Sequence, residues 1–145
     1  MNLVVRIPHK LKSAPCISLV EHYRTCASRY SPFEVKIGAV SAQNGRAPAE
    51  LLREMSEADS YLLSERGALV GTDWFVKVVK NCLAGRPTLF VVGEASGFPS
   101  ELPDHAKRSI SLTPLMLPHE LAIVLLVEQV WRAVSIEFRH PYHKA

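Results

Sequence analysis

The chain has 145 residues, of which 48% are hydrophobic and 21% charged, and its formal net charge is +3. This length is enough for one sizeable hydrophobic core and no more, so we expect a single domain over residues 1–145. The positive surplus is too small to indicate nucleic-acid binding by itself, but it is compatible with such binding if the cations gather on one face. We find no internal repeat, linker or low-complexity segment.

The three cysteines, Cys16, Cys26 and Cys82, are odd in number, widely spaced and without Cys-x-x-Cys spacing. Their apolar or helical surroundings predict buried thiols. The first ten residues contain neither a long apolar core nor a small-residue cleavage site, so we interpret them as a first strand rather than a signal peptide. Both observations favour a location in the reducing cytoplasm.

The first half of the chain alternates strands and helices. Leu3–Ile7 is a β-branched run that Pro8 ends, and it predicts a strand. Cys16–Ser28 has the apolar spacing of a helix. Phe33–Val40 alternates apolar and polar residues, which predicts a strand with one wetter face, and a short helix is expected over residues 48–57 after a polar loop.

The next segments continue the alternation. Ser60–Leu63 predicts a brief strand, Ser64–Gly71 a loop, and Thr72–Leu83 a helix that its first two residues cap. Thr88–Val92 is a continuous apolar run, which is typical of a strand buried on both faces of a parallel sheet. The pattern therefore predicts an α/β layered fold with a parallel sheet.

A glycine-containing turn, Gly93–Gly97, follows that buried strand. Ligands bind at the carboxyl ends of strands in open α/β sheets, so this turn is a candidate binding loop. Its glycines are four residues apart, which matches neither a dinucleotide-binding fingerprint nor a P-loop. Taken alone, the segment is more typical of a plain tight turn.

The region from Ser109 onward joins a loop, an apolar helix and a charged aromatic tail. Prolines hold residues 115–118 extended, and Pro118 is well placed as the first residue of a helix. The stretch Leu121–Val127 is apolar on every face, yet it is too short to span a bilayer. We therefore expect this helix to be buried against protein, with a second subunit as one source of cover.

Several motifs occur in the order typical of one enzyme family, and together they span nearly the whole chain. They are Lys10-Leu-Lys12, Tyr23 with Ser28-Arg-Tyr30, Gly93-x-x-x-Gly97, Ser109-x-Ser111-Leu, Leu117-Pro-His119, Glu128-Gln, Arg132-Ala and Pro141-Tyr-His-Lys144. The chain thereby resembles the RlmH family, ribosomal RNA large-subunit pseudouridine N3-methyltransferases of the SPOUT class. The Leu-Pro-His and Pro-Tyr-His-Lys motifs are the most specific of these.

This resemblance implies a fold and an activity. The fold is a SPOUT α/β knot, a parallel sheet flanked by helices whose C-terminal part is tied into a trefoil knot. The enzyme is a homodimer that binds S-adenosyl-L-methionine in the knot, and the C-terminal tail of one subunit completes the other subunit's site. The substrate is a pseudouridine in large-subunit ribosomal RNA, methylated at N3 on the assembled ribosome.

The resemblance also assigns residues to roles. The cofactor-binding residues would be Leu63, Gly93, Glu94, Gly97, Ser111, Leu112, Thr113, Leu115, Met116 and Leu117. The catalytic residues would be His143, as the base that takes the N3 proton, and Tyr142, which stacks on or orients the target base. RNA phosphates would be held by Lys10, Lys12, Arg139 and Lys144. His140 and His143 have no cysteine or carboxylate companion, so we expect no metal.

Five positions depart from the family pattern: His9, Ser64, Glu94, Met116 and Ile123. Glu94 would be strained if its loop required a positive φ, and Ile123 removes a cation from the helix beside the pocket. These departures leave open a catalytically weakened or inactive knotted dimer that serves as an RNA-binding or interaction module. A small-molecule enzyme of flavodoxin-like topology is a third possibility.

The dimer expectation concerns four apolar residues of the last helix, Leu121, Val124, Leu125 and Trp131. We expect them to be exposed to water in a single chain and covered in a dimer. Replacing Val124 by Asp is then expected to split the dimer.

Overall fold

A computed structural model describes residues 1–144 and contains one five-stranded sheet in the order β2-β1-β4-β3-β5. Each neighbouring pair of strands is parallel. The strands are β1 (Leu3–Ile7), β2 (Phe33–Ile37), β3 (Asp59–Leu69), β4 (Thr88–Val92) and β5 (Arg108–Ser111). The predicted parallel α/β sheet is confirmed.

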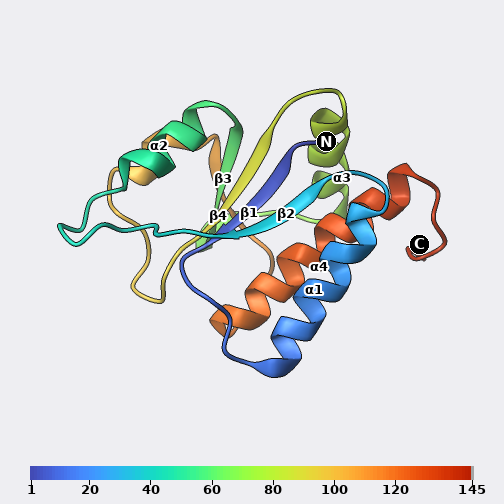
Figure 1. Cartoon of the computed structure of the whole chain (residues 1–145), viewed down its shortest axis with the longest axis horizontal. Helices are drawn as coiled ribbons and strands as arrows, with labels where there is room; N and C mark the ends of the chain where they lie inside the picture. The colour runs from blue at the N-terminus through green and yellow to red at the C-terminus, as the bar shows by residue number, and fades with distance from the viewer. Residues whose placement is uncertain (145) are drawn as a thin grey trace.

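Helices cover both faces of the sheet (Figure 1). Helices α1 (Ala14–Ser28), α3 (Thr72–Leu83) and α4 (His119–Glu137) pack on one face, whereas α2 (Ala49–Ser56) and the 3₁₀ helix η1 (Leu102–His105) pack on the other. Strand β4 lies at the centre and its five residues are buried. Phe90 points to the larger core under α1, α3 and α4, and the neighbouring Leu89 and Val91 point to the smaller core under α2, as the two-residue repeat of a strand requires.

Strand β3 is longer than its apolar run predicts. It continues to Leu69 through residues that we expected to form a loop, and its pairing with β5 shifts register between Leu63 and Ala68. The partner strand β5 was not predicted, because only Ile110 is apolar among its four residues. Pairing with β5 holds the polar part of β3 extended, which is a tertiary effect that local sequence does not encode.

Strand β2 ends at Ile37, three residues before its predicted end. Within residues 1–144 its only partner strand, β1, ends at Ile7, which pairs with Ile37. Just beyond, the guanidinium of Arg6 is almost fully buried and occupies the space next to Gly38. Arg6 donates hydrogen bonds to the carboxylate of Glu54 and to the carbonyl of Ala39, both at 2.8 Å. The chain leaves the sheet at this point, where the Ala39 carbonyl accepts one of these hydrogen bonds.

Helix α4 is buried by its own chain. Val124 is only 4% exposed and Trp131 is also buried, because α1 and α3 flank α4 on the sheet. The expectation that both would be exposed in a single chain is wrong, although Leu121 is 38% exposed as expected. A charge at Val124 would therefore disrupt the core of the subunit, so Val124→Asp cannot serve as a test of dimerisation.

The three cysteines differ in how far they are buried. Cys82 is buried, but Cys16 and Cys26 are only partly buried, at the edge of the larger core under α1. Within residues 1–144, no helix is both long and apolar enough to cross a membrane, and no cluster of three or more His, Cys, Asp or Glu side chains could hold a metal ion.

Candidate functional site

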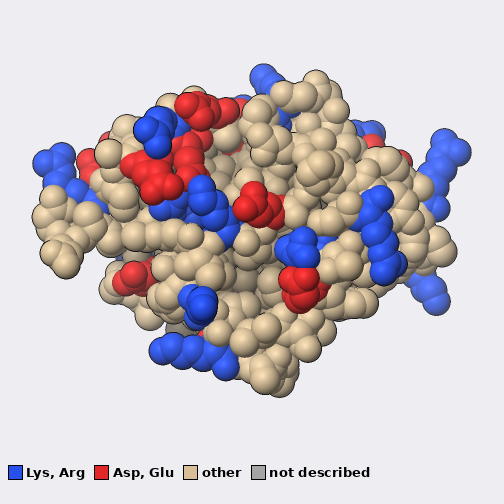
Figure 2. Space-filling model, viewed as in Figure 1, with Lys and Arg blue, Asp and Glu red and all other residues tan. Residues whose placement is uncertain are grey.

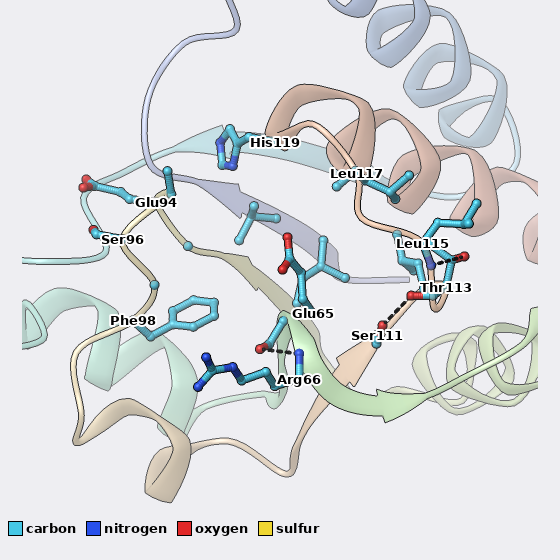
Figure 3. Close-up of a pocket in the computed structure, with 18 residues that line it drawn as sticks. Glu65, Arg66, Glu94, Ser96, Phe98, Ser111, Thr113, Leu115, Leu117 and His119 are labelled. Carbon is cyan, nitrogen blue, oxygen red and sulfur yellow. Dashed lines mark hydrogen bonds between the residues drawn. The ribbon is translucent and has the colours of Figure 1, made fainter.

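A pocket opens where the irregular middle part of β3 meets the segments that follow β4 and β5. It is lined by residues 63–66, 92–98, 111–113, 115 and 117, and His119 and Ala122 of α4 close one side (Figure 3). Its volume is about 560 Å³, which is typical of small-molecule sites. Parallel strands end at the same edge of a sheet, so segments far apart in sequence come together here.

Nine of the ten residues assigned to the cofactor line this pocket. They are Leu63, Gly93, Glu94, Gly97, Ser111, Leu112, Thr113, Leu115 and Leu117. The side chain of the tenth, Met116, does not line the cavity and is 84% exposed, so its assignment to the cofactor stays a prediction. Successive side chains of an extended segment point in opposite directions, and Met116 lies between two residues that face the pocket.

Nine further lining residues were not individually assigned to the cofactor: Ser64, Glu65, Arg66, Val92, Ala95, Ser96, Phe98, His119 and Ala122. Of these, Ala95 and Ser96 lie in the turn that was predicted as a binding loop. Glu65 and Arg66 were missed because β3 was expected to end at Leu63. The sequence position of Phe98 could have indicated a pocket residue, since it is a large apolar residue directly after the last glycine of the turn. These residues add an aromatic ring and charges of both signs to the walls.

The Gly93–Gly97 turn has the conformation that its glycines allow. Gly97 has φ of +96°, and its N–H donates to the carbonyl of Glu94 at 2.9 Å. A Cβ at Gly93 would lie 3.0 Å from the ring of Phe98, so the ring packs directly on the backbone there. Glu94 does not have a positive φ, and the expected strain at this position is absent. The glutamate is therefore compatible with the turn.

The loop after β5 is held by its own hydroxyl groups. Ser111 Oγ donates to the carbonyl of Thr113 at 3.0 Å, and the backbone N–H of Leu115 donates to Thr113 Oγ1 at 3.1 Å (Figure 3). Pro114 and Pro118 restrict the backbone further. The pocket wall formed by this loop is thus fixed before a ligand binds.

His119 lies at the start of α4 and borders the pocket (Figure 3). Its Nε2 is buried and has no hydrogen-bond partner among residues 1–144. Burial lowers the pKa of His119, and the nearby ring of His9 lowers it further, whereas Glu120 and Glu94 oppose the shift. An unpartnered buried nitrogen at a pocket wall is a candidate ligand contact.

Comparison with known proteins decides the family. A family model described as "Predicted SPOUT methyltransferase" matches residues 1–143. A ribosomal RNA large subunit methyltransferase H of Thermus thermophilus is 35% identical over 127 residues, which cover 86% of this chain and 85% of that protein. The protein of the same name from Rhodopseudomonas palustris is 33% identical over the full length of both chains. The chain belongs to the RlmH family of SPOUT methyltransferases.

The family resemblance drawn from the motifs is thus confirmed, and it gives the strand-end pocket its context. One of the five departures from the family pattern, Ile123, was expected to remove a cation beside the pocket. Ile123 is fully buried in the core and does not line the pocket, whereas its neighbour Ala122 does. An apolar side chain at position 123 therefore belongs to the packing of α4.

The two residues predicted to be catalytic do not lie at this pocket in the single chain. Tyr142 and His143 follow the carboxyl end of α4, whereas the pocket adjoins its amino end. A helix of 19 residues is about 28 Å long, and Figure 1 shows the C-terminus beside the carboxyl ends of α1 and α4. One chain therefore does not bring the tail to its own pocket.

The predicted RNA-binding cations form two groups. Lys10 and Lys12 lie on the loop before α1, which is held near the pocket because the Glu120 carboxylate accepts hydrogen bonds from the backbone N–H groups of Lys12 and Ser13. Arg139 and Lys144 belong to the tail. On the face in Figure 2, Lys and Arg are scattered and acidic side chains gather near α2. The cations are thus not collected into one patch on that face.

Proposed function

We propose that this protein is an S-adenosylmethionine-dependent methyltransferase that acts on N3 of a pseudouridine in large-subunit ribosomal RNA. The observation that carries the proposal is the pocket, because three segments of an RlmH-family chain, one within β3 and two after β4 and β5, close around a small-molecule cavity. The names of the relatives point to ribosomal RNA as the substrate.

The residues present suit S-adenosylmethionine. Leu63, Leu112 and Leu117 offer apolar surface for an adenine ring. The carboxylates of Glu65 and Glu94 suit the cationic sulfur and ammonium groups, and the guanidinium of Arg66 suits the carboxylate of the methionine part. When bound, S-adenosylmethionine supplies a methyl group on a positively charged sulfur. The chain's own residues bind this donor, orient it and exclude water.

The knot and the dimer belong to the same proposal. Membership of the family supports a trefoil knot around the pocket, formed by the segments after β4 and β5. The homodimer is supported by apolar side chains left exposed on α1 and at both ends of α4, namely Ile17, Leu121 and Phe138. A second copy that packs on these helices in the opposite direction would bring its tail toward this pocket.

In this arrangement the pocket holds the methyl donor, S-adenosylmethionine, and the partner's tail holds the RNA base that accepts the methyl group. Tyr142 and His143 of the tail would lie against the target base, and Arg139 and Lys144 would hold phosphates beside it. Lys10 and Lys12, on the loop next to the pocket, would hold the strand on the other side. Alignment of N3 with the methyl group then accounts for most of the rate enhancement.

Isothermal titration calorimetry tests the donor site. We expect S-adenosylmethionine to bind with a dissociation constant between about 1 μM and 1 mM, the usual range for enzyme substrates. Leu115→Asp places a charge on the pocket wall and should weaken binding at least about tenfold, roughly 1.4 kcal/mol. Met116→Asp, one residue away but outside the pocket, should leave binding unchanged. A flat titration with the unaltered protein would refute the donor site.

Methyl transfer to ribosomes from a strain that lacks the modification tests the reaction itself. We expect one methylated pseudouridine per large subunit, located by mass mapping. If RNA binding persists while transfer is absent, the protein is instead a non-catalytic RNA-binding module, the alternative that the substitutions at Ser64, Glu94 and Ile123 suggested.

A further inference from the structure

The C-terminal tail is anchored to α4 by an aromatic and charged cluster. The hydroxyl of Tyr142 donates a hydrogen bond to Glu128 Oε1 at 2.8 Å, and the guanidinium of Arg132 lies 4.8 Å from the centre of the Tyr142 ring. Trp131 packs against the same ring. Burial, together with the bond to Glu128, raises the pKa of Tyr142, so its hydroxyl stays protonated and donating. The tail therefore has a defined conformation.

One contact in this cluster determines the chemistry of His143. Arg132 Nη1 lies 3.1 Å from His143 Nδ1. A guanidinium nitrogen can only donate a hydrogen bond, so Nδ1 must accept it with its lone pair. A neutral imidazole carries a single proton, which is then on Nε2. The nitrogen of His143 that is left for other contacts is therefore an N–H donor.

Arg132 is itself held in the orientation that makes this contact. Its Nε and Nη2 both donate to Glu128 Oε1, at 3.0 and 2.7 Å. The other oxygen of Glu128 accepts from the side-chain amide of Gln129, and Gln129 Oε1 accepts from the hydroxyl of Thr72. Two of the three guanidinium nitrogens are thus bound to Glu128, and the third faces the imidazole. The network selects one tautomer of His143.

We propose that His143 acts as a hydrogen-bond donor through Nε2–H to a ring carbonyl of the target base, and that Arg132 is the positioning residue that holds it in this tautomer. The inference deepens the proposed function and rests on it, because it requires the tail to reach the target base. It replaces the role of proton acceptor that the sequence suggested for His143. An Nε2 that already carries a proton cannot take another from N3 while Nδ1 is engaged by Arg132.

The donor role fits the charge changes of the reaction. The N3–H bond breaks and its proton passes to water, which leaves an electron pair on N3 and spreads negative charge onto the two flanking carbonyl oxygens. This electron pair forms the new bond to the methyl carbon, the carbon–sulfur bond breaks, and its electrons stay on sulfur in S-adenosylhomocysteine. A fixed N–H aimed at one carbonyl stabilises the negative charge as it develops.

The tautomer can be measured in the free protein, without cofactor or RNA. Long-range ¹⁵N–¹H spectra distinguish protonated from unprotonated imidazole nitrogens, and the loss of one signal set in His143→Gln assigns this residue among the six histidines. At a pH where the rings are neutral, we expect the proton of His143 on Nε2. Arg132→Met should release the ring into a mixture of both tautomers. Tyr142→Phe, which keeps Arg132, should leave the single tautomer unchanged.

The methyl-transfer activity of two His143 variants distinguishes a hydrogen-bond donor from a general base. Glutamine offers an N–H donor but cannot accept a proton, so His143→Gln should keep methyl transfer within about tenfold of the unaltered enzyme, whereas His143→Ala should lose roughly 10² to 10³-fold, as for loss of one transition-state donor. Circular dichroism confirms that both variants are folded. The loss of activity in His143→Ala should appear in kcat rather than in KM, because the negative charge on the base develops only during the reaction.

Two results would overturn the inference. The first is a proton on Nδ1 of His143 in the unaltered protein, and the second is a His143→Gln enzyme as slow as His143→Ala. If the unaltered protein binds no S-adenosylmethionine and transfers no methyl group, the proposed function fails instead. The tautomer measurement still decides the assignment of Arg132 in that case, because it needs neither ligand.

Discussion

His119 shows at the scale of one residue how burial alters chemistry. Because burial disfavours its charged form, the pKa of His119 is lowered from its usual value of 6.5. Just below that usual value, the unfolded chain binds a proton that the native protein does not. The free energy of unfolding therefore falls as the pH drops through this window, and the contribution of His119 to stability is fully present only above it.

Replacing His119 by Gln should remove this contribution. Between about pH 7 and pH 5, the unfolding free energy of His119→Gln should depend less on pH than that of the unaltered protein. The effect should be small, because the ring is only partly buried. Urea unfolding at a series of pH values measures it. His105→Gln, at an exposed position in η1, is the matched control, and equal pH dependence in all three proteins would contradict the assignment.

At the scale of secondary-structure elements, the pairing of β3 with β5 shapes the pocket. The part of β3 at the register shift between Leu63 and Ala68 lines it, as do the end of β5 and the segment after it. Gly67 lies inside this irregular stretch. A Cβ there would come within 2.5 to 2.7 Å of the backbone of Ile110, so only glycine allows the two strands to approach.

Gly67→Ala should therefore push β5 away from β3. We expect a loss of unfolding free energy of at least about 2 kcal/mol, as for overpacked sites, together with weaker S-adenosylmethionine binding. Urea unfolding and calorimetry measure the two effects. Gly71→Ala is the control, since its Cβ would meet only a side-chain oxygen of Asp73 at 3.0 Å, and it should cost less than about 1 kcal/mol. Equal losses in both variants would exclude a special role for Gly67.

At the scale of the whole molecule, the pocket and the tail lie at opposite ends of α4, so the proposed reaction needs two chains. Leu121 is 38% exposed on α4, and a charge there should leave the subunit folded. Leu121→Asp should raise the dissociation constant of the dimer at least about 100-fold, roughly 2.7 kcal/mol, in sedimentation experiments. Ile37→Asp, at a 50% exposed position on β2, should not change it. A monomer in the unaltered protein would refute the dimer.

Mixing two impaired variants, at an S-adenosylmethionine concentration too low to fill the Leu115→Asp pocket, tests whether the tail acts on the other subunit. His143→Ala keeps an intact pocket, and Leu115→Asp keeps an intact tail. After subunit exchange, about half of the dimers are mixed and each has one complete site, so activity should recover to roughly a quarter of that of the unaltered enzyme. No recovery despite proven exchange would show that the tail does not serve the partner's pocket.

Local sequence patterns were enough to predict much of the fold of this protein and the position of its pocket. The apolar run of β4, the helical spacing of α1 and the strand-end position of Gly93–Gly97 correctly indicated a parallel α/β fold with a pocket at the carboxyl edge of the sheet. These features depend on residues close in sequence, so periodicity reveals them. The family, too, followed from motifs in the sequence.

Only the tertiary structure decided the features that depend on distant residues. Strand β5 and the end of β3 are held by each other, and β2 ends at the residue that pairs with the last residue of β1. Helices α1 and α3 bury the part of α4 that we expected a second subunit to cover. The orientation of His143 likewise depends on Arg132, eleven residues earlier in the chain. Such contacts are pairings across space, and no local pattern of residue types specifies them.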